Sequence, residues 1–251
     1  MRHRYIYGAL FLAFSLASAA TGFAQRGQGR GPGQGIHASE ARAQCLAAIN
    51  AIPKQTLDAT EAAGIAYLRE EEKLAHDVYA RLHAKWGLRI FGNISQSEER
   101  HFDALKVLLD RYELRDPAAN KPIGEFHNDG LQELYGSLTA EGEGSLKAAL
   151  KVGATIEDLD IRDLEKAAAA TDNSDLKMVY QNLKLASETH MRVFVQQLNA
   201  AGESYVPQHI NQARFSEIIA APQRPGKGNG GRGNGGGFGR GNNGSCPWMN
   251  P

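Results

Sequence analysis

A glutamate and a histidine three residues apart interrupt an otherwise apolar row in the segment 93–112. Apolar side chains recur there at spacings of three and four, which is the period of one face of an α-helix. Glu98 and His101 fall on this same face. A carboxylate and an imidazole at this spacing on an inward face form the Glu-x-x-His pair with which helical bundles bind transition metals. The pair is common by chance, so its meaning depends on what the other helices carry.

Three further segments with helical periodicity each place one residue that can bind a metal within their apolar row. These residues and their segments are Glu72 in 58–86, Glu157 in 145–170 and His190 in 174–200. Each residue falls near the middle of its row. The four segments together therefore predict a shared polar site inside the helices.

The charge of this site indicates a cation. Burial of three carboxylates without positive charge is strongly unfavourable, and these rows contain no Lys or Arg. Carboxylate and imidazole ligands suit iron, manganese or zinc. We therefore expect one or two metal ions, most readily iron or manganese. The expected ligands are Glu72, Glu98, His101, Glu157 and His190.

Several nearby acids have a simpler interpretation. Glu70, Glu71 and Glu99 are expected on solvated helix faces, close to Lys73 and Arg100. A single inward histidine is also more often a hydrogen-bonded core residue than a ligand. Only the coincidence of five such residues at matching depth favours metal binding.

The helices that must position this site are expected to form an all-α four-helix bundle. Asp58-x-x-Glu61 is a capping box that opens the first long helix, and Gly87 ends it. Asn93 is expected to cap the second long helix. The connection between the two is short, so the second helix returns antiparallel to the first.

A longer crossover, residues 118–144, carries a short amphipathic helix at 129–140 and lets the second pair of long helices lie beside the first. In the third long helix, Asp160 could supply a further ligand, but Asp160-x-x-Asp163 could also cap a restarted helix, and we favour the cap. Short accessory helices are expected at 38–52 and 212–219.

Composition argues against a nucleic-acid-binding protein, and the N-terminus predicts export. Its 251 residues are 42% hydrophobic, with 28 basic and 28 acidic side chains, so the charge gives no reason to expect nucleic acid as a partner. Residues 1–24 predict a signal peptide, with Arg2 and Arg4, then an apolar run, then cleavage near Ala24. We expect export to a periplasmic or extracellular space and no stable membrane span after cleavage.

The predicted organisation is a Gly-rich linker at 25–36, a helical domain at 37–222 and a disordered Gly/Asn/Arg-rich tail at 223–251. The two cysteines, Cys45 and Cys246, either form a disulfide, which an oxidising compartment permits, or remain independent thiols. Expected partners are the metal ion and, as an option, a second copy of the chain in a homodimer.

The chain resembles the ferritin-like superfamily, with spacing similar to rubrerythrin. The resemblance is carried by Glu72-Lys-Leu-Ala-His-Asp-Val-Tyr79, Glu98-x-x-His101, Glu157 and His190. Longer phrases, such as Asn-Ile-Ser-Gln-Ser-Glu-Glu-Arg-His and Val-Gly-Ala-Thr-Ile-Glu-Asp-Leu-Asp-Ile, look like a bacterial ferritin-like family still classed as a domain of unknown function. The similarity covers residues 57–219 and implies a ferritin-like bundle with a carboxylate and histidine site similar to a di-iron centre.

The sequence departs from the ferritin-like pattern in the fourth helix. The resemblance implies a Glu three residues before His190, but this position is Ser187. A single metal, or a second site completed by Asp160 or water, is compatible with this set. Tyr79 and Tyr180 could lie next to the site, although both are more simply core aromatics.

The sequence therefore predicts an exported metalloprotein that acts on peroxide, oxygen or ferrous ion. Whether it is an enzyme stays open. The alternative is a non-catalytic helical binding or envelope-associated protein with a degenerate metal site.

Overall fold

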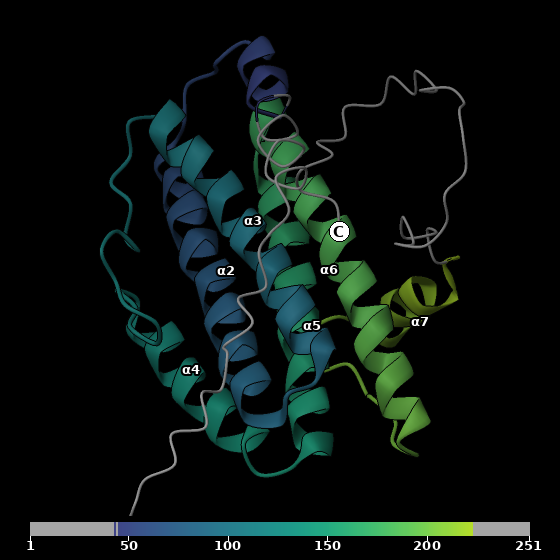
Figure 1. Ribbon diagram of the computed structural model, residues 1–251. Helices are drawn as coiled ribbons and strands as arrows, with labels where there is room; N and C mark the ends of the chain where they lie inside the picture. Colours follow the sequence, from purple (N-terminus) through teal and green to yellow (C-terminus); the bar gives the residue numbers. More distant parts are fainter. Residues whose placement is uncertain (1–42, 44, 223–251) are drawn as a thin grey trace, which may run out of the picture.

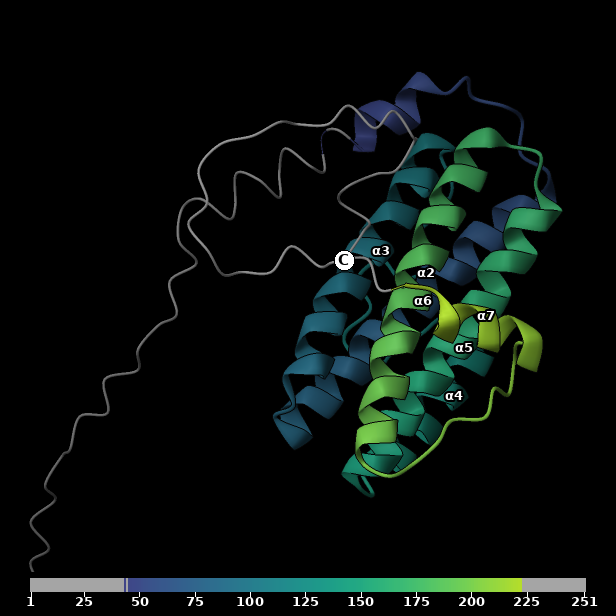
Figure 2. The same cartoon turned by 90° about the vertical axis from the view of Figure 1, so that its right-hand side faces the viewer.

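Four long helices lie side by side in the computed structural model, which describes residue 43 and residues 45–222 (Figures 1 and 2). They are α2 (Ala59–Trp86), α3 (Arg89–Arg111), α5 (Leu146–Ala170) and α6 (Ser174–Ala200). Helix α2 packs on α3 and α5 packs on α6, while contacts of α2 with α5 and of α3 with α6 join the two pairs. The described residues contain no strand, so the all-α prediction is confirmed for this part of the chain.

The ends of α2 follow the predicted signals. Asp58 accepts a hydrogen bond from the Glu61 backbone N–H at 2.8 Å, and Glu61 accepts one from the Asp58 backbone N–H at 2.9 Å. Gly87 ends the helix with φ of +67°, a left-handed conformation that glycine adopts without strain. The capping box and the glycine end are both confirmed.

The predicted start of α3 at Asn93 is wrong. The helix begins at Arg89, directly after Leu88, and no side chain caps it. The left-handed turn at Gly87 reverses the chain within two residues, and the fully buried Phe91 belongs to the apolar face from the first turn. Packing of this face stabilises the first turn without a capping side chain.

The crossover from α3 to α5 includes α4 (Asp129–Gly142), which contacts both α2 and α5. In Figure 1 the crossover runs along α2 from one end of the bundle to the other before α4 leads into α5. After α6, a loop leads to α7 (Gln212–Ala220), which packs against α6. The crossover between α3 and α5, which runs the length of the bundle, places α5 parallel to α3.

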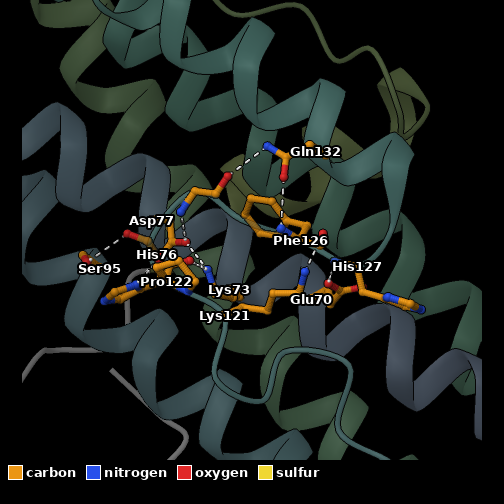
Figure 3. Close-up of polar contacts among 11 residues, drawn as sticks. Glu70, Lys73, His76, Asp77, Ser95, Lys121, Pro122, Phe126, His127 and Gln132 are labelled. Atoms are coloured by element: carbon orange, nitrogen blue, oxygen red, sulfur yellow. Dashed lines mark hydrogen bonds and ion pairs between the residues drawn. The ribbon is translucent and has the colours of Figure 1, made fainter.

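Charged residues of α2 hold the crossover in place (Figure 3). Glu70 accepts hydrogen bonds from the backbone N–H groups of His127 and Asn128. The ammonium group of Lys73 donates to the carbonyl oxygen of Pro122 at 2.8 Å and to Asp77 at 2.5 Å. The prediction that Glu70 is solvated is therefore wrong, since it is 2% exposed beneath the crossover. Glu99 is exposed, as predicted.

Two apolar clusters fill the interior at opposite ends of the long helices. One contains Val78, Phe91 and Phe194, and the other contains Ile65, Leu105 and Leu183. In α2, α3 and α6 the chain passes from one cluster to the other at Glu72, at Glu98 to His101 and at His190. The polar residues therefore form a layer between two apolar ones.

Several predictions concern residues outside the described ones. The signal peptide at 1–24, the linker at 25–36, the tail at 223–251 and Cys246 all lie there. Cys45 is buried in the second apolar cluster. In the part of the chain that the structure covers, no helix has the length and hydropathy needed to cross a bilayer.

Candidate metal centre

The five predicted ligands converge, with Glu98 at the centre. The Nδ1 atom of His101 lies 2.6 Å from Glu98 Oε2 and 3.3 Å from Glu72 Oε2. On the other side, Nδ1 of His190 lies 2.9 Å from Glu98 Oε1 and 3.5 Å from Glu157 Oε2. Each oxygen of Glu98 therefore faces one imidazole, and four different helices supply the group.

These contacts form two overlapping groups, each able to surround one cation. Glu72, Glu98 and His101 make the first group, and Glu98, Glu157 and His190 make the second. Within each group the ligand atoms lie within 4.8 Å of one another. The two imidazole rings stack with centroids 5.7 Å apart and an interplanar angle of 22°. A carboxylate shared by two groups can bridge two ions.

Among the described residues, the imidazoles form close ion-pair contacts with the carboxylates but none with the alignment of a hydrogen bond. Neither nitrogen of His101 or of His190 has a hydrogen-bond partner among the described residues, and Oε1 of Glu72 and of Glu98 also lacks one. Buried polar groups are normally satisfied. Metal–ligand bonds of about 2.0–2.2 Å place neighbouring ligand atoms roughly 3 Å apart with their lone pairs directed at the ion. The donor types and these orphaned atoms fit a bound transition metal.

Burial and mutual charge shift every titratable group of the cluster. Burial raises the pKa of Glu72 and of Glu157 to about 7, although the adjacent imidazoles oppose this shift. Burial by itself lowers the pKa of His190, but the charges of Glu98 and Glu157 raise it to about 9. Glu98 shows the reverse balance, since the two imidazoles lower its pKa against the effect of burial. Metal binding must therefore displace protons.

Tyr79 joins the cluster as a hydrogen-bond donor. Its hydroxyl lies 2.6 Å from Oε1 of Glu157 and 3.1 Å from the carbonyl oxygen of Gly153, and the residue is fully buried. The expectation that Tyr79 is only a core aromatic is therefore incomplete. Its position seven residues after Glu72, two helical turns along the same face, was the available sequence signal. Tyr180 makes no such contact with the five residues.

Asp160 corrects the prediction of a restarted helix. It lies inside the uninterrupted helix α5 and is 5% exposed, so it does not cap a restarted helix. The hydroxyl of Ser187 donates to its Oδ2 atom, while its Oδ1 atom has no partner among the described residues. Burial raises the pKa of Asp160, and the charges of Glu72 and Glu98 add to this shift. Asp160 is therefore a fourth acid beside the cluster, although it belongs to neither three-residue group.

Glu71 was predicted to be solvated, and this prediction is wrong. It is 3% exposed, and both of its oxygens lack a hydrogen-bond partner in the described part of the chain. Burial raises its pKa, reinforced by Asp160 and Asp163. The buried cations of α2 do not neutralise these acids, because Arg69 pairs with Asp116 and Lys73 pairs with Asp77.

Comparison with known proteins identifies a family and a similar protein. Residues 61–222 match the family described as an uncharacterized protein domain, DUF2202. The chain is 51% identical over 173 residues to the uncharacterized protein MJ0754 of Methanocaldococcus jannaschii, covering 69% of this chain and 94% of that protein.

The fold is similar to a crystal structure as well. The hypothetical protein MJ0754 from Methanococcus jannaschii superimposes with a TM-score of 0.68 at 50% identity, over 69% of this chain and 99% of that chain. The family match over residues 61–222 contains all five residues of the cluster.

Proposed function

The chain belongs to the DUF2202 family, and we propose that it is an exported metalloprotein whose long helices form a ferritin-like bundle around one or two iron or manganese ions. Glu72, Glu98, His101, Glu157 and His190 are the ligands in this proposal. The observation that carries it is the position of Glu98, whose two oxygens each lie within 2.9 Å of an imidazole nitrogen that no well-aligned hydrogen bond to a described residue satisfies.

Each residue has a defined role in this proposal. His101 and Glu72 would hold one ion, His190 and Glu157 would hold the other, and Glu98 would contribute to both sites. Tyr79 fixes the orientation of Glu157 through its hydroxyl. The apolar clusters cover the ligands from both ends of the bundle. Bound iron or manganese would supply redox chemistry toward peroxide, oxygen or ferrous ion.

One observation favours the alternative of a non-catalytic helical binding or envelope-associated protein. Ser187 occupies the position where the ferritin-like resemblance implies a carboxylate, and its hydroxyl donates to Asp160. With both imidazoles protonated, the cluster also balances much of its charge without metal. In that case the buried acids and histidines form an ion-pair network.

Thermal melts with and without metal distinguish these two functions. A ligand that binds only the folded state stabilises it by about 2.7 kcal/mol at one hundred times its dissociation constant. We expect added iron(II) or manganese(II) to raise the melting temperature of the wild type. Glu98→Gln should abolish this response, because both groups lose their shared carboxylate.

The matched control is Glu99→Gln, which removes the same charge from the adjacent, exposed position. This variant should respond to metal like the wild type. A wild-type melt that is indifferent to iron, manganese and zinc in verified metal-free protein would leave only the alternative function.

A further inference from the structure

A groove of about 510 Å³ lies between α3 and α6 and reaches the candidate metal centre. Its apolar lining comes from Ile90, Ile94 and Val193. His190, one of the five clustered residues, also lines it, as does Ser97, the neighbour of Glu98 in the sequence. The volume is within the range of small-ligand sites, roughly 300–1,000 Å³.

One side chain of the groove lining, Arg100, carries a permanent positive charge. Arg100 contributes the charged guanidinium of the lining, and within the described part of the chain no carboxylate lines the groove. Glu98 and Glu99 act on Arg100 electrostatically, but no ion pair or hydrogen bond joins its guanidinium to another described residue. An arginine without a partner presents donors whose planar geometry matches a carboxylate or phosphate.

Two buried polar groups on the groove lining also lack partners. Ser97 is 2% exposed and its hydroxyl makes no hydrogen bond to a described residue. It lies three residues before Arg100, so the two side chains are neighbours on one helix face. His190 is 3% exposed, and its Nε2 atom has no hydrogen-bond partner among the described residues, while Nδ1 faces the carboxylates. A metal-bound imidazole normally donates its second N–H to an acceptor.

From this combination we infer that the groove is a binding site for a small oxyanion, either a carboxylate or an inorganic phosphate-like anion. Arg100 pairs with its charge, the Ser97 hydroxyl donates to it, and the His190 ring lies beside it. That the anion lies next to a metal ion rests on the function proposed above, whereas binding of the anion in the groove does not.

Calorimetric titration of the metal-free protein with inorganic phosphate, and separately with acetate, tests the anion site. We expect Arg100→Gln to weaken binding by at least about tenfold, because a charge-assisted pair is lost. Ser97→Ala should weaken it by about fivefold through the loss of one donor. The control Arg115→Gln removes the same charge from an exposed position outside the groove and should bind within about twofold of wild type.

Binding of either anion with this order of variants supports the site, and the stronger anion identifies the ligand chemistry. The inference is overturned if neither anion binds, or if Arg100→Gln and Arg115→Gln bind equally well. If Ser97→Ala is more stable than the wild type but binds the anion with unchanged affinity, the Ser97 hydroxyl does not contact the anion.

The same anions added to cobalt(II)-loaded protein test the position beside His190. The visible spectrum of the cobalt should change over the anion concentrations that give half-saturation in calorimetry. A spectrum unchanged at saturating anion would overturn the placement next to the metal. If the protein binds no cobalt, iron or manganese, the proposed function fails, while the calorimetric result still decides whether the groove binds anions.

Discussion

Replacement of Tyr79 by phenylalanine should affect both stability and metal affinity. The hydroxyl of Tyr79 donates to Glu157 at 2.6 Å within a fully buried site. Its removal leaves a buried carboxylate oxygen without a donor, which costs about 1–3 kcal/mol. For a domain of this size each kcal/mol lowers the melting temperature by about 2–4 °C, so a decrease of about 2–12 °C is expected. Loss of a group that orients a ligand should also weaken metal binding by about tenfold or more.

The assay is a thermal melt of metal-free protein together with a competition titration for manganese(II). Tyr180→Phe is the matched control, because Tyr180 is 2% exposed on α6 but its hydroxyl makes no hydrogen bond to a described residue. Its stability should change by less than about 0.5 kcal/mol. If Tyr79→Phe behaves like Tyr180→Phe in both measurements, Tyr79 does not orient a metal ligand and the assigned role is wrong.

Three further predictions concern the scaffold. An added Cβ at Gly153 would lie 2.4 Å from the ring of Phe194. Gly153→Ala should therefore lower the free energy of unfolding, measured by chemical denaturation, by about 1–3 kcal/mol. The control Gly136→Ala should not, because its Cβ would meet no atom of the described residues within 4 Å. Asp158 accepts hydrogen bonds from three successive backbone N–H groups of the loop before α7 and from a tyrosine hydroxyl, so Asp158→Ala should cost about 3 kcal/mol and abolish hydrogen-exchange protection in that loop. Although burial opposes the shift, hydrogen bonds from a neighbouring histidine and lysine and from a backbone N–H lower the pKa of Asp77. Its stabilisation is therefore complete above the unfolded pKa of about 3.9 and disappears as pH falls through the folded pKa, so Asp77→Asn should flatten the acid side of the stability curve.

The local signals in the sequence predicted the long helices well. The capping box at Asp58 and the glycine at Gly87 specify the ends of α2 by short-range hydrogen bonds and backbone conformation. Ser145 likewise caps α5 through its side chain. The start of α3 at Arg89 could not be found in this way, because tertiary packing of Phe91 stabilises it and no capping residue marks it.

The candidate site shows the same division between local and long-range information. Helical periodicity predicted that Glu72, Glu98 and His101 lie on the buried faces of their helices, since each interrupts an apolar row. The burial of Glu70 depends on the crossover, which is more than fifty residues away in sequence. Glu70 accepts hydrogen bonds from backbone N–H groups of this crossover. The Asp160-x-x-Asp163 spacing favours a cap, whereas the actual partner of Asp160 is Ser187, which lies on another helix. Pair contacts between distant segments leave no periodic signal in either segment.

The number of metal ions bound per chain decides whether the cluster is a metal centre. Protein stripped of metal is dialysed against manganese(II) or, without oxygen, against iron(II), and bound metal is counted by elemental mass spectrometry. We expect one or two ions in the wild type, a loss of at least half in His101→Ala and again in His190→Ala, and loss of nearly all of it in Glu98→Gln, because Glu98 belongs to both groups. The control His127→Ala, at an exposed position of the crossover, should bind like the wild type. Wild-type protein that retains no iron, manganese or zinc, or an equal metal content in Glu98→Gln and His127→Ala, would contradict the assignment of this cluster as a metal centre.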